Sequence, residues 1–375
     1  MRSKREILFG FVRGGAAIFV ALAVAIIFIF ICSDTPGKAI EYLLVKPILN
    51  TGVNGISFNA SSFYIVLSRM IPTIFTGLAV CVMFSANQFN LAGEGAVMLG
   101  GFVAALCGIY WTMPAGVHVT VCVLMGALSC GVVMLLPALL KTKLGASEMV
   151  SSLMLNYVIQ YVVLHFLNND FADRSKGSTQ TFPFAETAKV PDLVPGTDLT
   201  WGFVVALVVT VLVAIFMYRT RWGYAIRMIG INKDFSKYSG IKVGAIIVLS
   251  QVVGGFISGM SGSIEVLGRF DTFLWRELPG YGWTGVTIAI LAKNNPAYVP
   301  IAAFFMAYLE RGCELMRTFA GVPSEMLDII QAVIFLFFAA EQFLAGYRQK
   351  IVVKGAKEEL ARQSAGAAQE KGAEA

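Results

Sequence analysis

Charged residues are scarce in this sequence. Asp, Glu, Lys and Arg make up 14% of its 375 residues, against about a quarter in an ordinary soluble domain, while 57% of the residues are apolar. The mean hydropathy is +0.72. This composition excludes a soluble globular domain, a disordered chain and a collagen-like fibre, and it is typical of a polytopic α-helical membrane protein.

Signatures of metal sites and of catalysis are also missing. The six cysteines stand singly in apolar stretches, which predicts small core residues rather than metal or redox ligands. Histidine occurs only at His118 and His165, too rarely for a His-rich metal site or proton relay. No G-x-x-x-x-G-K-[ST] loop is present to cradle the phosphates of ATP. We therefore expect no metal, no cofactor and no enzymatic activity in this chain.

The positive charge does not indicate nucleic acid. The formal net charge is +6, but in a membrane protein the side of the bilayer that carries Lys and Arg matters more than their total. We expect the chain to contact membrane lipid and no nucleic acid.

Ten apolar stretches predict ten transmembrane helices, of which the eighth is too short to cross alone. Lys and Arg are most numerous on the cytoplasmic side when both termini are placed in the cytoplasm. We expect a transmembrane domain over residues 1–344 and a polar, disordered cytoplasmic tail over 345–375. The predicted spans are 14–32, 63–84, 92–110, 115–140, 148–167, 201–218, 243–266, 282–292, 297–316 and 324–344.

Glycine-rich breaks divide the sequence in a symmetrical way. With ten crossings, the two five-helix halves have opposite topology, as in inverted repeats. A break follows the second helix of each half, at residues 89–95 and 278–285. Unwound backbone at membrane depth is tolerated only where it is buried or lines a wet cavity, so matching breaks indicate a transport pathway. The alternative is that these glycines only allow close helix packing.

Polar residues inside the spans form a candidate substrate pathway, because such residues are costly in a membrane unless they are used or paired. Their amides and carboxylates lie near aromatic residues, which suits a neutral polar ligand with a flat ring. The alternative is hydrogen bonding between helices. The candidates are Asn87, Gln88, Asn90, Glu94, Asn156, Gln251, Glu265, Tyr281 and Trp283, with Gln160 facing them.

A second group of charged residues lies nearer the predicted outer surface. We interpret it as structural ion pairs or the rim of an entrance. Its members are Arg69, Glu310, Arg311, Glu314, Glu325 and Asp328.

A short helix is predicted over residues 232–240, on the cytoplasmic side. An asparagine can cap its N-terminus, an acid lies in its first turn, a lysine in its last, and a glycine suits the left-handed position that ends it. Two aromatic residues three apart form one face, suited to docking in a groove of a partner domain; the alternative is a helix lying on the inner leaflet. The residues concerned are Asn232, Asp234, Phe235, Lys237, Tyr238 and Gly240.

The longest predicted outer loop, residues 168–200, is polar and contains several prolines. It is either a docking surface for an external binding protein or a linker.

Several stretches resemble the permease subunits of bacterial ABC importers of the ribose and branched-chain-amino-acid superfamily, and most closely the nucleoside-importer branch. Residues 219–241 resemble the whole superfamily, whereas 90–95 (NLAGEG) and 154–157 (MLNY) look like the nucleoside branch. Ala96 stands where many relatives carry Gln, and Trp283 and Thr284 where Phe and Asp are common. The matching stretches are 89–95, 145–157, 180–184, 219–241, 259–268, 280–285 and 322–331.

The resemblance implies a permease in the bacterial cell membrane that translocates nucleosides by alternating access, with purine nucleosides as the favoured cargo. It further implies a second, homologous permease, a cytoplasmic ABC ATPase subunit bound through residues 232–240, and an extracellular substrate-binding lipoprotein. One alternative is the same machinery carrying a sugar or a branched-chain amino acid. Another is an ion-coupled secondary transporter, for which Glu94 and Glu265 are the candidate titrating acids.

Overall fold

The computed structural model describes residues 35–323, apart from 53, 54 and 178, and a few single residues outside that range. The chain divides into two units, one of residues 33–327 and one of residues 1–32 with 328–375. The first and last predicted spans and the polar tail lie almost entirely outside the described residues.

Most of the described part of the chain is helical, and its one small β-hairpin pairs β1 (Leu49–Gly52) antiparallel with β2 (Gly55–Phe58). Two short 3-10 turns, η1 (Glu186–Ala188) and η2 (Pro296–Tyr298), lie in connections. The helices are α2 (Pro36–Leu44), α3 (Ala60–Ser85), α4 (Gly93–Tyr110), α5 (Val117–Val133), α6 (Leu135–Leu144), α7 (Glu148–Asn169), α8 (Gly202–Arg219), α9 (Arg221–Ile231), α10 (Lys233–Tyr238), α11 (Val243–Arg269), α12 (Tyr281–Leu291) and α13 (Val299–Ala320).

The second to ninth predicted spans coincide with helices. Among the described residues, α3, α4, α5 with α6, α7, α8 and α11 are long and apolar enough to cross a membrane. Helix α12 has only 11 residues, in agreement with the prediction that this span cannot cross alone. The predicted all-helical, polytopic membrane class is thereby confirmed.

The fourth predicted span differs from expectation, because it divides at Met134 into α5 and α6. Pro137 lies in the first turn of α6 and has no N–H to donate to the carbonyl oxygen of Val133. The hairpin was not predicted either, since its strands are only four residues long.

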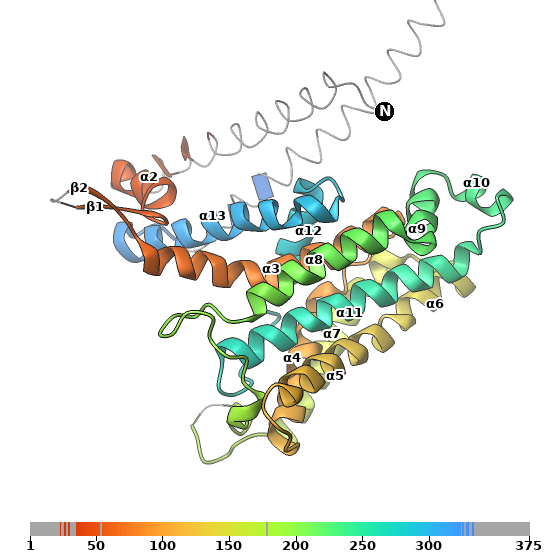
Figure 1. Ribbon diagram of the computed structural model, residues 1–375, viewed down its shortest axis with the longest axis horizontal. Coiled ribbons are helices and arrows are strands. Elements are labelled where there is room, and N and C mark those ends of the chain that lie inside the picture. The colour runs from red at the N-terminus through yellow and green to blue at the C-terminus, as the bar shows by residue number, and fades with distance from the viewer. Residues whose placement is uncertain are drawn as a thin grey trace, which may run out of the picture. The chain divides into compact units, whose positions relative to one another are not determined.

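Helix α11 is the centre of the bundle and packs against α3, α4 and α5 (Figure 1). Small residues allow its backbone to approach α4 closely: a Cβ atom on Gly262 would lie 1.8 Å from the carbonyl oxygen of Val97. The hydroxyl of Ser263 donates to the carbonyl oxygen of Gly100 at 3.0 Å, and that of Ser261 to Pro72 at 2.9 Å. Close packing of small residues with hydroxyl hydrogen bonds is the usual means of association between helices in membranes.

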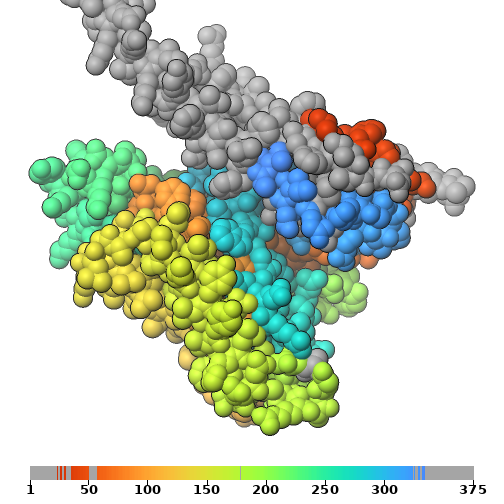
Figure 2. Space-filling model, turned by 180° about the vertical axis from the view of Figure 1, so that it is seen from behind, coloured from red at the N-terminus to blue at the C-terminus, as the bar shows by residue number. Residues whose placement is uncertain are grey.

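Helices α5, α7 and α8 cover the bundle and expose apolar side chains on their outer faces; Figure 2 shows the face covered by α7. Only one side of α8 is buried, through Ala206, Thr210, Val213 and Met217. Exposed apolar faces of this extent suit contact with lipid. The cysteines of the described residues are buried, as predicted for small core residues.

We predict that Gly262→Ala lowers the thermal unfolding temperature of the detergent-purified protein. The new Cβ would overlap the backbone of α4, and overpacking of this kind costs about 1–3 kcal/mol of unfolding free energy. Gly244→Ala is the matched control, since it lies in the same helix and a Cβ there meets no atom within 4 Å. Equal unfolding temperatures for the two variants would contradict close packing of α11 on α4.

Candidate functional site

The two predicted breaks are non-helical only in their first part, residues 89–92 and 278–280, and they meet inside the bundle. The chain between α3 and α4 is irregular over residues 86–92, and that between α11 and α12 over 270–280. Each predicted break therefore also includes the first turn of the helix that follows. Gly280 has a φ of +87°, in the left-handed region that favours glycine, and it immediately precedes α12.

Glu94 joins the two breaks. This residue lies in the first turn of α4 and is only 1% exposed. Its carboxylate accepts hydrogen bonds from the backbone N–H groups of Gly280, of Gly282 at 2.5 Å and of Trp283 at 3.3 Å. These are the free N–H groups at the start of α12, where the helix dipole also favours negative charge. The buried charge of one half of the chain is thus stabilised by a helix terminus of the other half.

Glycine at position 282 is required by this contact. A Cβ atom there would lie 2.5 Å from the backbone nitrogen of Glu94. The close approach of α12 to α4, rather than a turn, explains this part of the Gly-rich stretch.

Amide side chains hold the first break from two sides. Nδ2 of Asn90 donates to Oε1 of Gln251 on α11 at 2.9 Å. On α7, Oδ1 of Asn156 accepts from the N–H of Gly95 at 2.8 Å, and its Nδ2 donates to the carbonyl oxygen of Leu91 at 3.0 Å. All three amide residues are buried. Nε2 of Gln251 has no hydrogen-bond partner in the described structure, so this layer retains one free donor.

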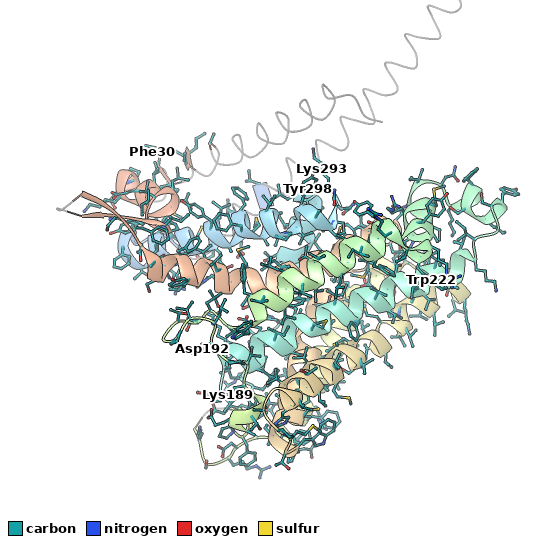
Figure 3. All side chains as sticks on the ribbon, viewed as in Figure 1. Phe30, Lys189, Asp192, Trp222, Lys293 and Tyr298 are labelled. Atoms are coloured by element: carbon teal, nitrogen blue, oxygen red, sulfur yellow. The ribbon has the colours of Figure 1, made fainter. Side chains whose placement is uncertain are left out.

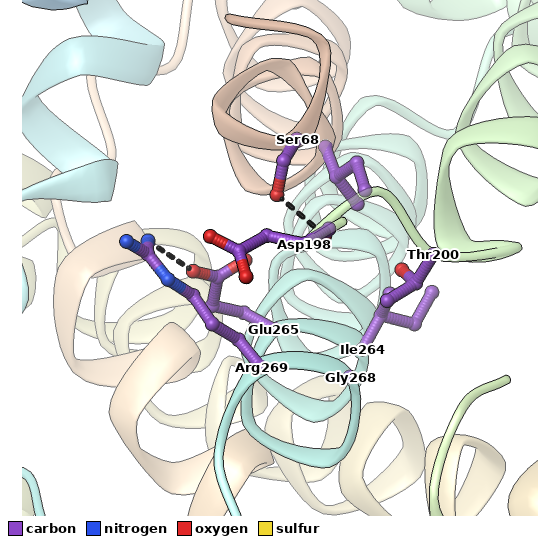
Figure 4. Close-up of a pocket in the computed structure, with 8 residues that line it drawn as sticks. Ser68, Asp198, Thr200, Ile264, Glu265, Gly268 and Arg269 are labelled. Carbon is purple, nitrogen blue, oxygen red and sulfur yellow. Dashed lines mark hydrogen bonds and ion pairs between the residues drawn. The ribbon is translucent and has the colours of Figure 1, made fainter. Parts of the chain in front are cut away.

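A second polar contact ties the start of α12 to α11. The hydroxyl of Tyr281 donates to Oε1 of Glu265 at 3.0 Å, and the same oxygen pairs with Arg269 at 3.2 Å. Figure 4 shows the small pocket beside this pair, where Asp198 approaches Arg269 and the hydroxyl of Ser68 donates to the backbone carbonyl of Asp198 at 2.9 Å. Glu265 is therefore a buried, paired carboxylate.

The predicted ion pairs nearer the outer surface are confirmed for four residues. Arg69 of α3 pairs with Glu310 at 2.6 Å and with Glu314 at 2.9 Å, both on α13. Arg311 pairs with Glu314 at 2.5 Å. Glu325 and Asp328 lie beyond the continuous part of the described residues.

The nine predicted pathway residues do not form one cluster. Asn90, Glu94, Asn156 and Gln251 share the buried layer at the first break, whereas Glu265 pairs with Tyr281. Their polar atoms bond mainly to one another and to the backbone, so contact with a cargo stays a prediction for them.

The side chains of the remaining pathway residues form no hydrogen bond with that layer, although the backbone N–H of Trp283 donates to Glu94. Asn87 is exposed, and Gln88 bonds only to the neighbouring carbonyl oxygens of residues 86 and 87. Trp283 is 48% exposed.

Ser152 was not among the predicted residues, yet its hydroxyl accepts the N–H of Leu91 at 2.9 Å. Its position four residues before Asn156 places both on one face of α7, and this spacing was the available signal. Within residues 35–323, no three His, Cys, Asp or Glu side chains come together to hold a metal ion.

The predicted short helix is present as α10, at the end of the bundle beside α9 (Figure 1). Oδ1 of Asn232 caps it by accepting the N–H of Phe235 at 2.9 Å, and Gly240 has a φ of +81°. Phe235 is 55% exposed and Tyr238 is 92% exposed. The capping and the aromatic face agree with the prediction.

The loop after α7 lies at the opposite end of the bundle from α9, as the labels of Lys189 and Trp222 show in Figure 3. It is joined to the segment after α11, because Lys189 pairs with Asp271 at 2.7 Å and the N–H of Thr181 donates to the carbonyl oxygen of Phe273 at 3.1 Å. Hydrogen bonds with Asp271 and Glu186 raise the pKa of Lys189 above its usual value, so its positive charge is secured.

We predict that Glu94→Gln destabilises the protein. An amide has only one acceptor oxygen, and its NH2 group would face the N–H donors of α12; losing a hydrogen bond to a charged group costs roughly 1.5–3 kcal/mol. The measurement is thermal unfolding in detergent, with Glu186→Gln as a control that removes an exposed carboxylate. A Glu94→Gln variant that unfolds at the wild-type temperature would show that the carboxylate does not hold α4 to α12.

Comparison with known proteins identifies the family of this chain. Residues 62–339 match the family described as the permease component of the branched-chain amino acid transport system. The chain is 29% identical over 329 residues to the glucose ABC transporter permease protein TsgB13 of Haloferax volcanii, covering 83% of this chain and 85% of that protein. It is also 29% identical over 294 residues to the guanosine ABC transporter permease protein NupP of Bacillus subtilis, covering 77% and 84%.

A third relative is the nucleoside ABC transporter permease protein NupB of Lactococcus lactis, which is 26% identical over 296 residues. The match covers 76% of this chain and 81% of that protein. No solved structure matches the chain significantly. The family predicted from the sequence is confirmed. With its apolar helices, its meeting helix breaks and a family match over residues 62–339, this chain belongs to the branched-chain amino acid transport system permease family and is a multi-pass membrane permease subunit of an ABC transporter.

Proposed function

We propose that this chain is the permease of an ATP-driven importer of nucleosides in a bacterial cell membrane, with purine nucleosides as the favoured cargo. The observation that carries the transport mechanism is the junction at Glu94, where two helices begin inside the bundle rather than at its ends. The relatives named for guanosine and for nucleosides support the cargo.

The junction suits alternating access. Helix α12 contacts α3 around Thr76 and Gly77, well inside that helix, and its first turn is held by Glu94 of α4. Broken helices at membrane depth require burial or a wet cavity. Helix α12 could therefore move as a rigid body about the glycine at 280, and the second break would move with it. The carboxylate of Glu94 would keep its backbone N–H donors or exchange them for others during this movement. No covalent step on the cargo is needed.

The topology is proposed as ten transmembrane helices in two inverted five-helix repeats. Residues 1–344 would form the membrane domain, and residues 345–375 a cytoplasmic tail. Helices α6, α9 and α10, which carry Lys141, Lys143 and most of the basic residues of 219–242, lie toward the same end of the bundle (Figure 1). Under the positive-inside rule this end faces the cytoplasm, and both termini with it.

Three protein partners follow from this orientation. The exposed aromatic face of α10 would bind a cytoplasmic ABC ATPase subunit, which supplies the hydrolysis of ATP. The loop of residues 168–200, at the other end, would receive an extracellular substrate-binding lipoprotein. A second, homologous permease would complete the pathway, with membrane lipid on the remaining apolar faces.

A sugar is the second candidate cargo, because a glucose permease is 29% identical to this chain over 329 residues. The same polar layer and helix junction would serve either cargo, so cargo must be tested directly.

We predict that labelled guanosine enters cells that carry this chain faster than cells that lack it. Unlabelled nucleosides should compete, whereas glucose, ribose, leucine and free bases should not. Depletion of ATP should abolish uptake, and collapse of the ion gradient at constant ATP should not. Competition by glucose would indicate that the cargo is a sugar. Uptake that depends on the ion gradient would indicate that the gradient, and not ATP, is the energy source.

We predict that Phe235→Ala reduces ATP-dependent uptake by about tenfold while the protein stays folded, since an exposed aromatic anchor at the centre of an interface typically contributes at least 1–2 kcal/mol. Uptake and co-purification of the ATPase subunit are measured together. Tyr110→Ala is the control, an aromatic residue 57% exposed at the far end of α4. Normal uptake and normal co-purification in Phe235→Ala would remove α10 from the proposed interface.

A further inference from the structure

Two charged residues, Arg276 and Glu277, stand exposed between α11 and α12. Neither side chain takes part in an ion pair with another residue of the described stretch. The predicted spans 243–266 and 282–292 place the pair in an outer connection, whereas in the structure the segment returns into the bundle.

The segment that carries this pair lies beside the middle of a membrane span. Nε2 of Gln160 donates to the carbonyl oxygen of Arg276 at 3.3 Å. On α7, Gln160 is about 18 Å along the axis from Glu148 and about 13 Å from Asn169, at 1.5 Å per residue. The hydrocarbon core of a bilayer is about 30 Å thick, so a bilayer crossed by α7 would have the backbone of Arg276 near its middle. Figure 2 shows the same adjacency, with the cyan segment beside the yellow-green residues of α7.

The segment is fixed at both ends. Its start is held by the outer loop through Lys189 with Asp271 and through Thr181 with Phe273. Its end is held by Glu94 through Gly280. Between these points the ring of Trp275 packs 5.7 Å from that of Phe273, against α4. The two charges are therefore carried on an anchored backbone.

An exposed charge and an exposed non-helical backbone are both excluded from contact with lipid at this depth. This side of the segment must then border an aqueous path or a polar partner. Trp283, in the first turn of α12, is exposed next to the same junction.

We propose that Arg276, Glu277 and Trp283 contact the cargo and select an uncharged molecule with a flat ring. This inference rests on the proposed nucleoside transport. A guanidinium only donates hydrogen bonds and a carboxylate only accepts them, and the two charges cancel, so a neutral ligand that has both acceptors and donors is matched. The guanidinium and the indole also stack on flat rings.

The base of a purine nucleoside has these properties. Guanine presents the acceptors O6 and N7 to an arginine, and its N–H groups to a carboxylate, while its ring supplies a face for stacking. A free sugar has no aromatic face, and an amino acid carries charges of its own. The segment thus favours a nucleoside over the other cargoes considered.

The test uses the complete transporter in cells and the variants Arg276→Gln and Glu277→Gln, each of which removes one charge with little change in size. Uptake of labelled guanosine, of 7-deazaguanosine, which lacks N7, and of inosine, which lacks the 2-amino group, is measured at saturating concentration. Arg317→Gln is the control, an exposed arginine in the last turn of α13, away from every proposed binding surface. The external binding protein is the same in every strain, so a changed preference reports on the permease.

We expect each pathway variant to transport guanosine about tenfold more slowly, as for loss of a charge-assisted hydrogen bond. Arg276→Gln should also lose the preference of the wild type for guanosine over 7-deazaguanosine, and Glu277→Gln its preference for guanosine over inosine. Arg317→Gln should match the wild type. Yield and thermal unfolding in detergent identify a variant that fails to fold, in which case Arg276→Lys and Glu277→Asp are assayed for the same shift in preference.

Two results would overturn the inference while leaving nucleoside transport intact. One is wild-type rates and preferences in both variants. The other is an equal loss for all three nucleosides, which would indicate that the pair contacts the second permease. Absence of nucleoside uptake by the wild-type chain would instead overturn the proposed function itself.

Discussion

The hydrogen bonds between the Glu94 carboxylate and the N-terminus of α12 are the contact on which the interior of this permease depends. A buried carboxylate is unfavourable unless it is paired, and an unpaired helix N-terminus is unfavourable for the same reason. Each satisfies the other across nearly two hundred residues of sequence. Two helices can therefore begin inside the bundle, which lipid alone would not permit.

Other interactions around this contact serve the same end. Asn156 and Gln251 bind the irregular chain before α4 from two directions, and Tyr281 ties the start of α12 to α11. Helix α11 reaches both sets of contacts because glycines allow it to lie directly against α4. Hydrogen bonding of buried polar groups and close packing of helices thus occur in one layer, and displacement of α12 would change both.

The same arrangement divides polar residues by role. Those with bonded partners, such as Asn90 and Glu265, hold helices together in this conformation. The side chains of Arg276 and Glu277 are exposed beside the middle of α7 and form no ion pair with another described residue, and we propose that they meet the cargo. A permease of a neutral molecule needs both kinds, since binding groups must be presented on a backbone that is itself satisfied.

Hydrophobic length and glycine position determined the class, most helix bounds, the short α12, the two breaks and the capped α10, because spans, caps and left-handed turns depend on local sequence. Tertiary structure decided which polar residues meet. Sequence spacing placed Glu94 beside a break but did not identify its partners, which are backbone N–H groups with no residue-type signal. The predicted spans leave residues 267–281 as a connection, and only the path of residues 270–280 back into the bundle shows that the backbone of Arg276 lies beside Gln160 of α7.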